Sequence, residues 1–495
     1  MTDPTEASIA DLCSSMERGA LRCIDLVAAY RAKIVAEDGS FNAVAFLNPD
    51  AEDIAEGLDR ERAEGRVRGS LHGVPILVKD NIASGDKMMT SAGSLALNGV
   101  GAPADSHVVS CLRAAGAVLL GKTNLSEWAN FRSTRSSSGW SSRGGQVRNA
   151  YATDRTPGGS SSGSGVAAAR GFCAAAIGTE TDGSVVSPST MNSIVGIKPT
   201  VGMIGRTGII PISHSQDTAG PMARTVADAA AVLSAIAGAD AADPVTAQAQ
   251  RGDFTQFLDV AALRGKRIGV VRNYADFHEA VDAVFAEALD ALVEAGATLV
   301  DDLSLAPRDE IRPHELIVMM TEFKVGLNAY LAGLGPETPV RTLADVIAFN
   351  EAHAGRTMPY FGQEILLMAE ETGGLEDRVY QTALAVSRRL TRENGIDKAL
   401  RDHQLDALVA PTASAPWAID LVNGDNRGSG GSSSLAAVSG YASITVPMGY
   451  VSGLPVGLSF IGGAWSDGPL IGLAHAFERT RQVRVPPGPA QRFLP

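Results

Sequence analysis

Two serines in glycine-rich turns and one lysine after an apolar run are the residues of this chain best suited to covalent chemistry. Ser160 lies in residues 157–165, which read Pro-Gly-Gly-Ser-Ser-Ser-Gly-Ser-Gly, and Ser184 ends residues 179–184, which read Thr-Glu-Thr-Asp-Gly-Ser. Lys79 lies upstream of both turns, directly after a short apolar run. Glycine-flanked turns allow two serines to approach each other closely. A lysine and two serines in this order predict a hydrolase site that needs neither histidine nor a metal ion.

A serine hydroxyl becomes an effective nucleophile only when a base accepts its proton. Histidine is the usual base, but a buried lysine can replace it because desolvation lowers the pKa of the ammonium group. A second serine between the two can pass the proton along. The site also needs backbone N–H groups directed at the developing oxyanion, and the turn at residues 181–184 offers such donors at the candidate nucleophile, Ser184.

Six short blocks, in this order along the chain, resemble the amidase signature family. They are residues 73–81 (Gly-Val-Pro-Ile-Leu-Val-Lys-Asp-Asn), 121–127 (Gly-Lys-Thr-Asn-Leu-Ser-Glu), 158–164 (Gly-Gly-Ser-Ser-Ser-Gly-Ser), 178–184 (Gly-Thr-Glu-Thr-Asp-Gly-Ser), 196–200 (Gly-Ile-Lys-Pro-Thr) and 216–224 (Gln-Asp-Thr-Ala-Gly-Pro-Met-Ala-Arg). The resemblance covers about residues 70–235, with weaker similarity near residues 406–412 and 454–462. One such block is weak evidence, whereas six in family order are specific.

The resemblance implies a role for each residue of the site. Lys79 corresponds to the base, Ser160 to the bridging serine and Ser184 to the nucleophile, and a cis peptide bond is expected before Ser160. The implied oxyanion donors are the backbone amides of Thr181, Asp182, Gly183 and Ser184. The implied fold class is α/β: a single amidase-signature domain over residues 1–495, with a central mixed β-sheet covered by helices on both faces.

The hydrophobic pattern agrees with an alternating α/β chain. Short apolar runs predict buried strands at residues 74–78, 118–120, 267–271, 407–410, 444–446 and 456–461. Helices are predicted at residues 22–36, 166–177 (rich in alanine) and 225–237 (with Thr225 as the N-cap). Residues 311–400 are predicted to be mostly helical, and as the part most divergent from the family pattern they are expected to shape the distal substrate pocket.

Blocks around the nucleophile indicate a substrate class. Residues 126–132, 138–146 and 179–184 are similar to bacterial peptide amidases, which remove the C-terminal amide of a peptide and release ammonia. Many family members carry an arginine two residues after the nucleophile, but this chain has Val186 there, so no substrate selection can be inferred from that arginine. The expected substrate is a small-molecule or short-peptide amide. The residues predicted to contact it are Trp128, Asn130, Phe131, Ser161 and Tyr360.

Several alternatives stay open at the level of sequence. The same triad can cleave aryl acylamides, esters or carbamates (urethanes), because acylation needs only an electrophilic carbonyl and a leaving group that accepts a proton. An amidotransferase-type subunit would supply ammonia to a partner, but the acidic charge and Val186 count against it. A catalytically inactive binding module is disfavoured because no triad position is substituted. Residues 159–163 match G-x-S-x-G, yet the polar, proline-containing residues before them cannot form the strand that an α/β-hydrolase elbow requires.

Composition excludes other classes of function. The 495 residues carry a formal net charge of −13, which argues against nucleic acid or an anionic membrane as a partner. The four cysteines are too scattered for a disulfide framework, and the eight histidines show no metal-binding spacing. No apolar run is long enough to span a membrane, and the N-terminus lacks a secretory signal. We therefore predict a cytoplasmic enzyme without metal or cofactor, with homo-oligomerisation left open.

Overall fold

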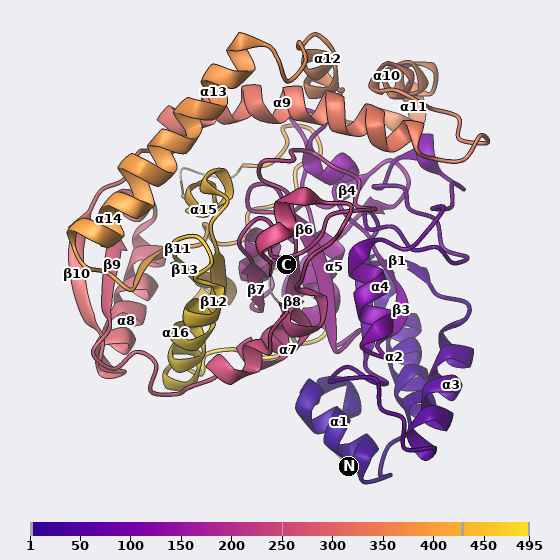
Figure 1. The fold of residues 1–495 in the computed structure, drawn as a ribbon, viewed down its shortest axis with the longest axis horizontal. Coiled ribbons are helices and arrows are strands. Elements are labelled where there is room, and N and C mark those ends of the chain that lie inside the picture. The colour runs from indigo at the N-terminus through magenta and orange to yellow at the C-terminus, as the bar shows by residue number, and fades with distance from the viewer. Residues whose placement is uncertain (1–2, 250, 427–429, 494–495) are drawn as a thin grey trace.

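A mixed β-sheet of 11 strands forms the centre of the computed structural model, which describes residues 3–249, 251–426 and 430–493 (Figure 1). In order across the sheet, the strands are β1 (Val44–Leu47), β3 (Val118–Thr123), β2 (Pro75–Lys79), β6 (Ala175–Glu180), β8 (Thr218–Ala223), β7 (Val195–Lys198), β12 (Ser443–Val451), β13 (Leu454–Ile461), β11 (Ala407–Pro411), β9 (Arg267–Val271) and β10 (Thr298–Leu303). A separate ribbon pairs β4 (Trp140–Ser141) with β5 (Gly145–Gln146).

The strands that carry the candidate site lie in the first half of this sheet. β3, β2 and β6 are parallel neighbours, whereas β6 through β11 in sheet order pair antiparallel, each with the next. All residues of β2, β3 and β6 are buried, as expected for parallel strands covered on both faces. All six predicted strands are present, and β9 begins and ends at the predicted residues.

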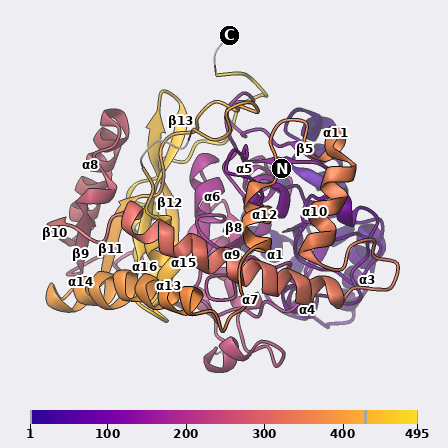
Figure 2. The ribbon, with the colours of Figure 1, turned by 90° about the horizontal axis from the view of Figure 1, so that it is seen from above.

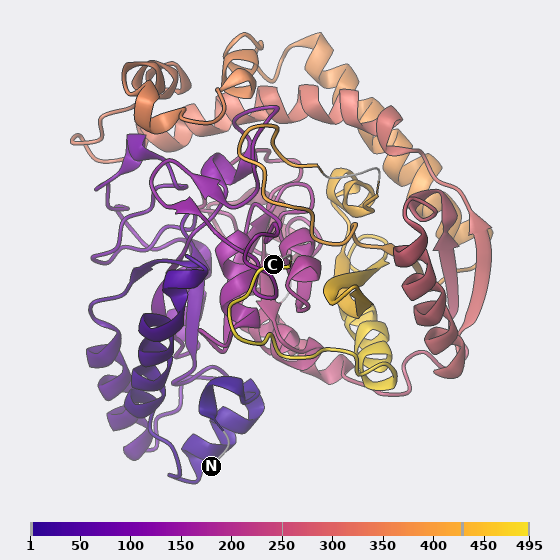
Figure 3. The same ribbon diagram turned by 180° about the vertical axis from the view of Figure 1, so that it is seen from behind.

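Helices flank the sheet on both sides (Figures 2 and 3). They are α1 (Ile9–Glu17), α2 (Cys23–Glu37), α3 (Ala51–Ala63), α4 (His107–Ala114), α5 (Ser162–Ala169), α6 (Val186–Met191), α7 (Val226–Ile236), α8 (Glu279–Glu294), α9 (Arg308–Ala332), α10 (Leu343–Ala352), α11 (Ala354–Thr357), α12 (Glu364–Glu370), α13 (Arg378–Arg388), α14 (Asp397–Asp402), α15 (Ser433–Ser439) and α16 (Asp467–Thr480). α5 and α6 pack together against the central strands, and α7 packs with α16 on the other side. The predicted α/β architecture of one domain is confirmed. Among the described residues, no helix combines the length and apolar character that crossing a membrane requires.

The prediction of a single helix over residues 166–177 is wrong. α5 ends at Ala169, Gly171 takes a left-handed φ of 66°, and the alanine-rich residues that follow form β6. Alanine has the highest intrinsic helix propensity, but here the run lies in the middle of the sheet, paired with β2 on one side and β8 on the other. Burial and strand pairing therefore decide the conformation, not local propensity. By contrast, α2 and α7 match their predictions, and Thr225 Oγ1 accepts a hydrogen bond from Asp228 N as an N-cap.

Residues 311–400 form a largely helical layer, as predicted. The long helix α9 packs along α13 and α12, and together they arch over one end of the sheet (Figure 1). A second apolar cluster joins this layer to the loops of the sheet, and it includes Trp128, Phe131 and Phe323. The rings of Phe131 and Phe323 meet edge to face, with centroids 5.2 Å apart. This contact ties α9 to the loop that carries three of the predicted substrate-binding residues.

Candidate active site

Lys79, the last residue of β2, is buried and lies against Ser160 at the start of the segment that leads into α5. Its Nζ is 2.8 Å from Ser160 Oγ. Nζ also lies 2.8 Å from Thr179 Oγ1 and 3.3 Å from the Thr179 carbonyl oxygen. A neutral amine has two N–H donors and one lone pair. The two oxygens of Thr179 can therefore accept both N–H groups, which leaves the lone pair free to accept the Ser160 hydroxyl proton.

The electrostatic environment favours this neutral form. Burial lowers the pKa of Lys79 to about 7, although the negative charges of Asp217 and Glu180 act in the opposite direction. An exposed lysine titrates about three units higher and is almost fully protonated at neutral pH. The buried position of Lys79 thus makes it a competent base near neutrality.

Ser184 follows β6 in the turn that leads into α6. Its carbonyl oxygen accepts a hydrogen bond of 3.2 Å from Ser161 N, which places the two serine-bearing turns side by side. The peptide bond between Gly159 and Ser160 is cis, as the resemblance implies. Within the described part of the chain, no hydrogen bond joins the hydroxyls of Ser160 and Ser184. A serine hydroxyl can move between staggered rotamers about a single bond. Proton transfer between Ser160 and Ser184 is therefore a proposal.

Residues 181–184, here called the nucleophile turn, have four backbone amides that are available as donors. None of their N–H groups donates a hydrogen bond to another described residue. Gly183 adopts a left-handed φ of 82°, which a residue with a side chain rarely tolerates. Thr181, Gly183 and Ser184 are buried and Asp182 is partly buried. Buried backbone N–H groups are almost always paired, so amides without a partner among the described residues match the requirement of an oxyanion hole.

Several buried polar groups hold the nucleophile turn in place. Glu180 Oε2 accepts hydrogen bonds from the N–H groups of Val185 and Val186, at 2.7 and 3.0 Å, and so fixes the start of α6. Thr181 Oγ1 donates to Asp217 Oδ1 at 2.5 Å, and Gln216 Nε2 donates to the Thr181 carbonyl oxygen at 3.2 Å. Hydrogen bonds therefore hold the turn at its first residue, Thr181, and at Val185 and Val186, which follow its last residue.

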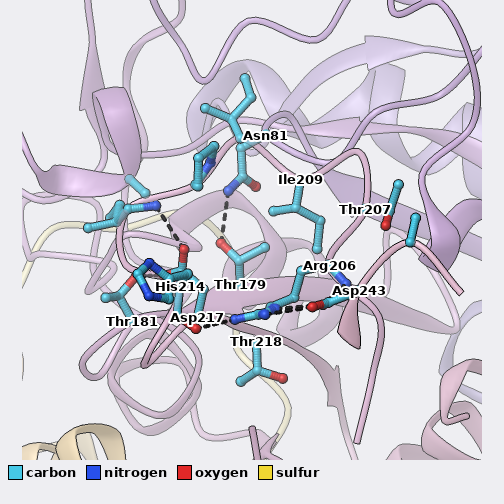
Figure 4. Close-up of a pocket in the computed structure, with 15 residues that line it drawn as sticks. Asn81, Thr179, Thr181, Arg206, Thr207, Ile209, His214, Asp217, Thr218 and Asp243 are labelled. Atoms are coloured by element: carbon cyan, nitrogen blue, oxygen red, sulfur yellow. Dashed lines mark hydrogen bonds and ion pairs between the residues drawn. The ribbon is translucent and has the colours of Figure 1, made fainter. Parts of the chain in front are cut away.

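A cavity of about 220 Å³ lies next to Thr179 and Thr181 (Figure 4). Its polar lining includes Asn81, whose Nδ2 donates to Thr179 Oγ1 at 3.0 Å and whose Oδ1 is buried with no partner in the described part of the chain. Arg206 pairs with Asp243 in its wall at 2.7 Å. Two hydrogen bonds, from Asn81 to Thr179 Oγ1 and from Lys79 to the same oxygen, thus connect this cavity to Lys79 Nζ.

The predicted substrate-binding residues fall into two environments. Trp128 and Asn130 lie in a loop in which three consecutive residues have positive φ values: 51° at Trp128, 52° at Ala129 and 69° at Asn130. Such strained backbone is enriched at functional sites. Trp128 Nε1 and Asn130 Oδ1 are buried and have no hydrogen-bond partner among the described residues. Phe131 is buried against α9. Tyr360 is half-exposed and packs edge-on against Trp140, with ring centroids 5.7 Å apart.

Ser161 has a different environment from the other predicted contacts. It is buried, its Oγ donates to the Thr179 carbonyl at 3.1 Å, and it accepts from Thr179 N at 3.2 Å. These bonds fasten the start of α5 to β6. Contact between Ser161 and a substrate stays a prediction. Val186, where many relatives carry arginine, is buried as the first residue of α6.

Sequence reasoning missed Thr179, the residue that occupies the two remaining positions around Lys79 Nζ. Only the pairing of the strands reveals the contact between Thr179 and Lys79. β2 and β6 are parallel neighbours, with Val78 opposite Ile177. That register sets the end of β2 beside the end of β6. It also missed Gln216, whose Nε2 donates to the Thr181 carbonyl oxygen, and Glu315, whose Oε1 accepts from the same Nε2. Among the described residues, no group of histidine, cysteine and carboxylate side chains has the geometry of a metal site.

Comparison with known proteins gives a consistent picture. The family model described as Amidase matches residues 25–471. A probable amidase of Arabidopsis thaliana is 41% identical to this chain, over 97% of the chain and 91% of the relative. The crystal structure of native peptide amidase from Stenotrophomonas maltophilia is 50% identical, superposes with a TM-score of 0.94, and the match covers 98% of each chain. A structure of peptide amidase in complex with the competitive inhibitor chymostatin is 51% identical, also with a TM-score of 0.94, over 98% of this chain and 99% of the other.

Proposed function

Because the chain belongs to the amidase family and is a hydrolase that acts on C–N bonds, we propose that it hydrolyses the C-terminal amide of peptides and releases ammonia. In this proposal Lys79, Ser160 and Ser184 form the catalytic triad. The observation that carries it is the buried contact of 2.8 Å between Lys79 Nζ and Ser160 Oγ, with the lysine pKa lowered to about 7.

The proposed reaction proceeds in two stages. Neutral Lys79 accepts the proton of Ser160, Ser160 accepts that of Ser184, and Ser184 Oγ attacks the amide carbonyl carbon. The free N–H groups of the nucleophile turn stabilise the oxyanion of the tetrahedral intermediate. The proton then returns through Ser160 to the amide nitrogen, the C–N bond breaks and ammonia leaves. Water then attacks the acyl carbon of the acyl-enzyme and passes its proton through Ser160 to Lys79. The proton returns to Ser184 Oγ as the ester bond breaks, which releases the free carboxylic acid and restores Ser184.

Two features support a peptide amide as the substrate. The first is the high similarity to peptide amidase over nearly the whole chain. The second is the loop at residues 128–130, where the buried donor Trp128 Nε1 and the buried acceptor Asn130 Oδ1 find no partner among the residues that the structure describes. Buried polar groups of this kind are normally satisfied. A peptide backbone supplies one acceptor and one donor per residue and therefore complements such a pair.

Identifying the covalent intermediate and ranking substrates tests this proposal. The enzyme is labelled with a fluorophosphonate and digested, and the modified peptide is identified by mass spectrometry; we expect the adduct on Ser184. Ammonia release from amidated dipeptides is then compared with the cleavage of a matched anilide, ester and carbamate of the same acyl group. The proposal requires the highest kcat/KM on the dipeptide amide. An adduct on another serine would contradict the triad, and a clear preference for the anilide, ester or carbamate would contradict the substrate.

A further inference from the structure

The carboxyl group of Asp182, in the middle of the nucleophile turn, has one satisfied oxygen and one unsatisfied oxygen. Oδ2 accepts a hydrogen bond of 2.7 Å from Ser434 Oγ, at the start of α15. Oδ1 is buried and receives no donor from the described residues. A buried carboxylate oxygen without a donor is costly, so a neighbouring group that can donate a proton to Asp182 would stabilise it.

That neighbour is Glu315 on α9. Its side chain is buried, and both the charge of Asp182 and a hydrogen bond with the Asp182 side chain raise the pKa of Glu315. Glu315 Oε1 accepts from Gln216 Nε2 at 3.1 Å, and the same Nε2 donates to the Thr181 carbonyl at 3.2 Å. Glu315 is thus connected to two consecutive residues of the nucleophile turn, to Asp182 directly and to Thr181 through Gln216.

Two ionised carboxylates in contact repel each other, and burial strengthens the repulsion because the local dielectric constant is low. If one of them keeps its proton, the O–H group donates to the other, and both the repulsion and the missing hydrogen bond disappear. We propose that Asp182 and Glu315 share one proton and that this pair is a positioning device, through which α9 holds the nucleophile turn. The functional part of this inference rests on the proposed role of that turn as an oxyanion hole.

The surrounding charges agree with a retained proton. Burial and the neighbouring Asp182 both raise the pKa of Glu315, whereas the hydrogen bond from Gln216 and the charge of Arg308 lower it. Other charged or titratable groups around the pair come from several elements: Glu180 at the end of β6, Lys198 at the end of β7, Tyr274 before α8, and Arg308 and Asp309 at the start of α9. Burial raises the pKa of Tyr274 as well, so its phenol stays protonated and adds no charge beside the pair.

The pair has a consequence for the pH dependence of the enzyme. Glu315 binds a proton in the folded state above its ordinary pKa of 4.5, whereas the unfolded chain has released it there. Folding stability from this group therefore decreases as pH rises above 4.5 towards the raised pKa. When the shared proton is finally lost, the two carboxylates repel, the nucleophile turn is displaced, and activity falls on the alkaline side.

Infrared spectroscopy of Glu315→Gln detects the shared proton without any substrate. The wild-type protein should show the carbonyl band of a protonated carboxylic acid at neutral pH, sensitive to exchange into D₂O, and the variant should lack that component. The matched control is Glu310→Gln, which removes an exposed carboxylate from the same helix and should keep the band. If the wild-type and Glu315→Gln spectra agree in this region, the inference is wrong, whatever the enzyme hydrolyses.

Activity measurements then test the positioning role. In Glu315→Gln the amide N–H replaces the shared proton as donor to Asp182, so we expect kcat to stay within about threefold of wild type at neutral pH and the alkaline decline to be lost. In Glu315→Met the donor is absent, and kcat should fall by about tenfold or more with little change in KM. Equal kcat values for the Gln and Met variants, or an unchanged alkaline decline in Glu315→Gln, would overturn the role. A protein inactive on all amides would refute the proposed function and leave the infrared result standing.

Discussion

The strands around Lys79 and the helical layer at residues 311–400 differ in how completely they are buried. In the first region, β2 and β6 are buried on both faces, Lys79 ends β2, and Ser184 follows the end of β6. In the second, helices such as α13 keep one polar, solvent-exposed side, and only one face packs inward. The comparison indicates that the candidate catalytic residues are positioned by fully buried strands, whereas the proposed influence of α9 acts from outside these strands. The two regions meet at Phe131–Phe323 and at Gln216–Glu315.

Replacing the proposed nucleophile should produce the largest effect. Ser184→Ala removes the attacking oxygen but changes little volume, so we expect kcat to fall by at least about 1,000-fold while the fold is retained. Steady-state kinetics on a dipeptide amide, with circular dichroism as the control for folding, measure this. Activity within tenfold of wild type would place the nucleophile elsewhere.

Two buried lysines on adjacent strands allow a matched test of the base. Burial lowers the pKa of Lys79 to about 7 and that of Lys122 to about 8, but Lys122 Nζ is directed at the carbonyl oxygen of Ile82 and the hydroxyl of Thr90. Lys79→Met should lower kcat by about 1,000-fold, whereas Lys122→Met should act mainly on stability, with kcat reduced by about tenfold at most. Similar losses of kcat in both variants would show that kcat depends on the presence of a buried lysine and not on its contact with Ser160.

Smaller effects should separate the substrate contacts of the two regions. Asn130→Ala removes an unpaired acceptor near the sheet, and we expect KM for a dipeptide amide to rise by about tenfold with kcat changed less. Tyr360→Ala removes a half-exposed ring of the helical region and should change KM by only about two- to threefold, most for long peptides. If Tyr360→Ala has the larger effect on dipeptides, the helical layer binds substrate more closely than the comparison implies.

Motifs identified the candidate catalytic residues, but long-range packing could not be predicted from them. The blocks at 73–81, 158–164 and 178–184 predicted Lys79, Ser160 and Ser184 because each block is local in sequence. Thr179 lies inside one of these blocks, but its role depends on the pairing of β2 with β6, which no single segment reveals. The alanine-rich run at 166–177 misled the helix prediction for the same reason.

Glu315 shows the limit of sequence reasoning most clearly. It lies on a predicted helix, more than 100 residues from the turn that it contacts. A glutamate on a helix ordinarily faces solvent, and nothing in its own segment indicates burial beside Asp182. α9 runs across the end of the sheet (Figure 1), and this path places Glu315 where it interacts with Asp182.

The pH dependence of kcat/KM below neutrality tests most directly whether neutral Lys79 is the base. Since only the unprotonated amine can accept the Ser160 proton, and burial sets its pKa at about 7, kcat/KM should rise as pH increases and level off just above pH 7. The slope below that point should be about tenfold per pH unit, as for a single titrating group. A profile that is flat from about pH 5 to pH 8 would contradict the account.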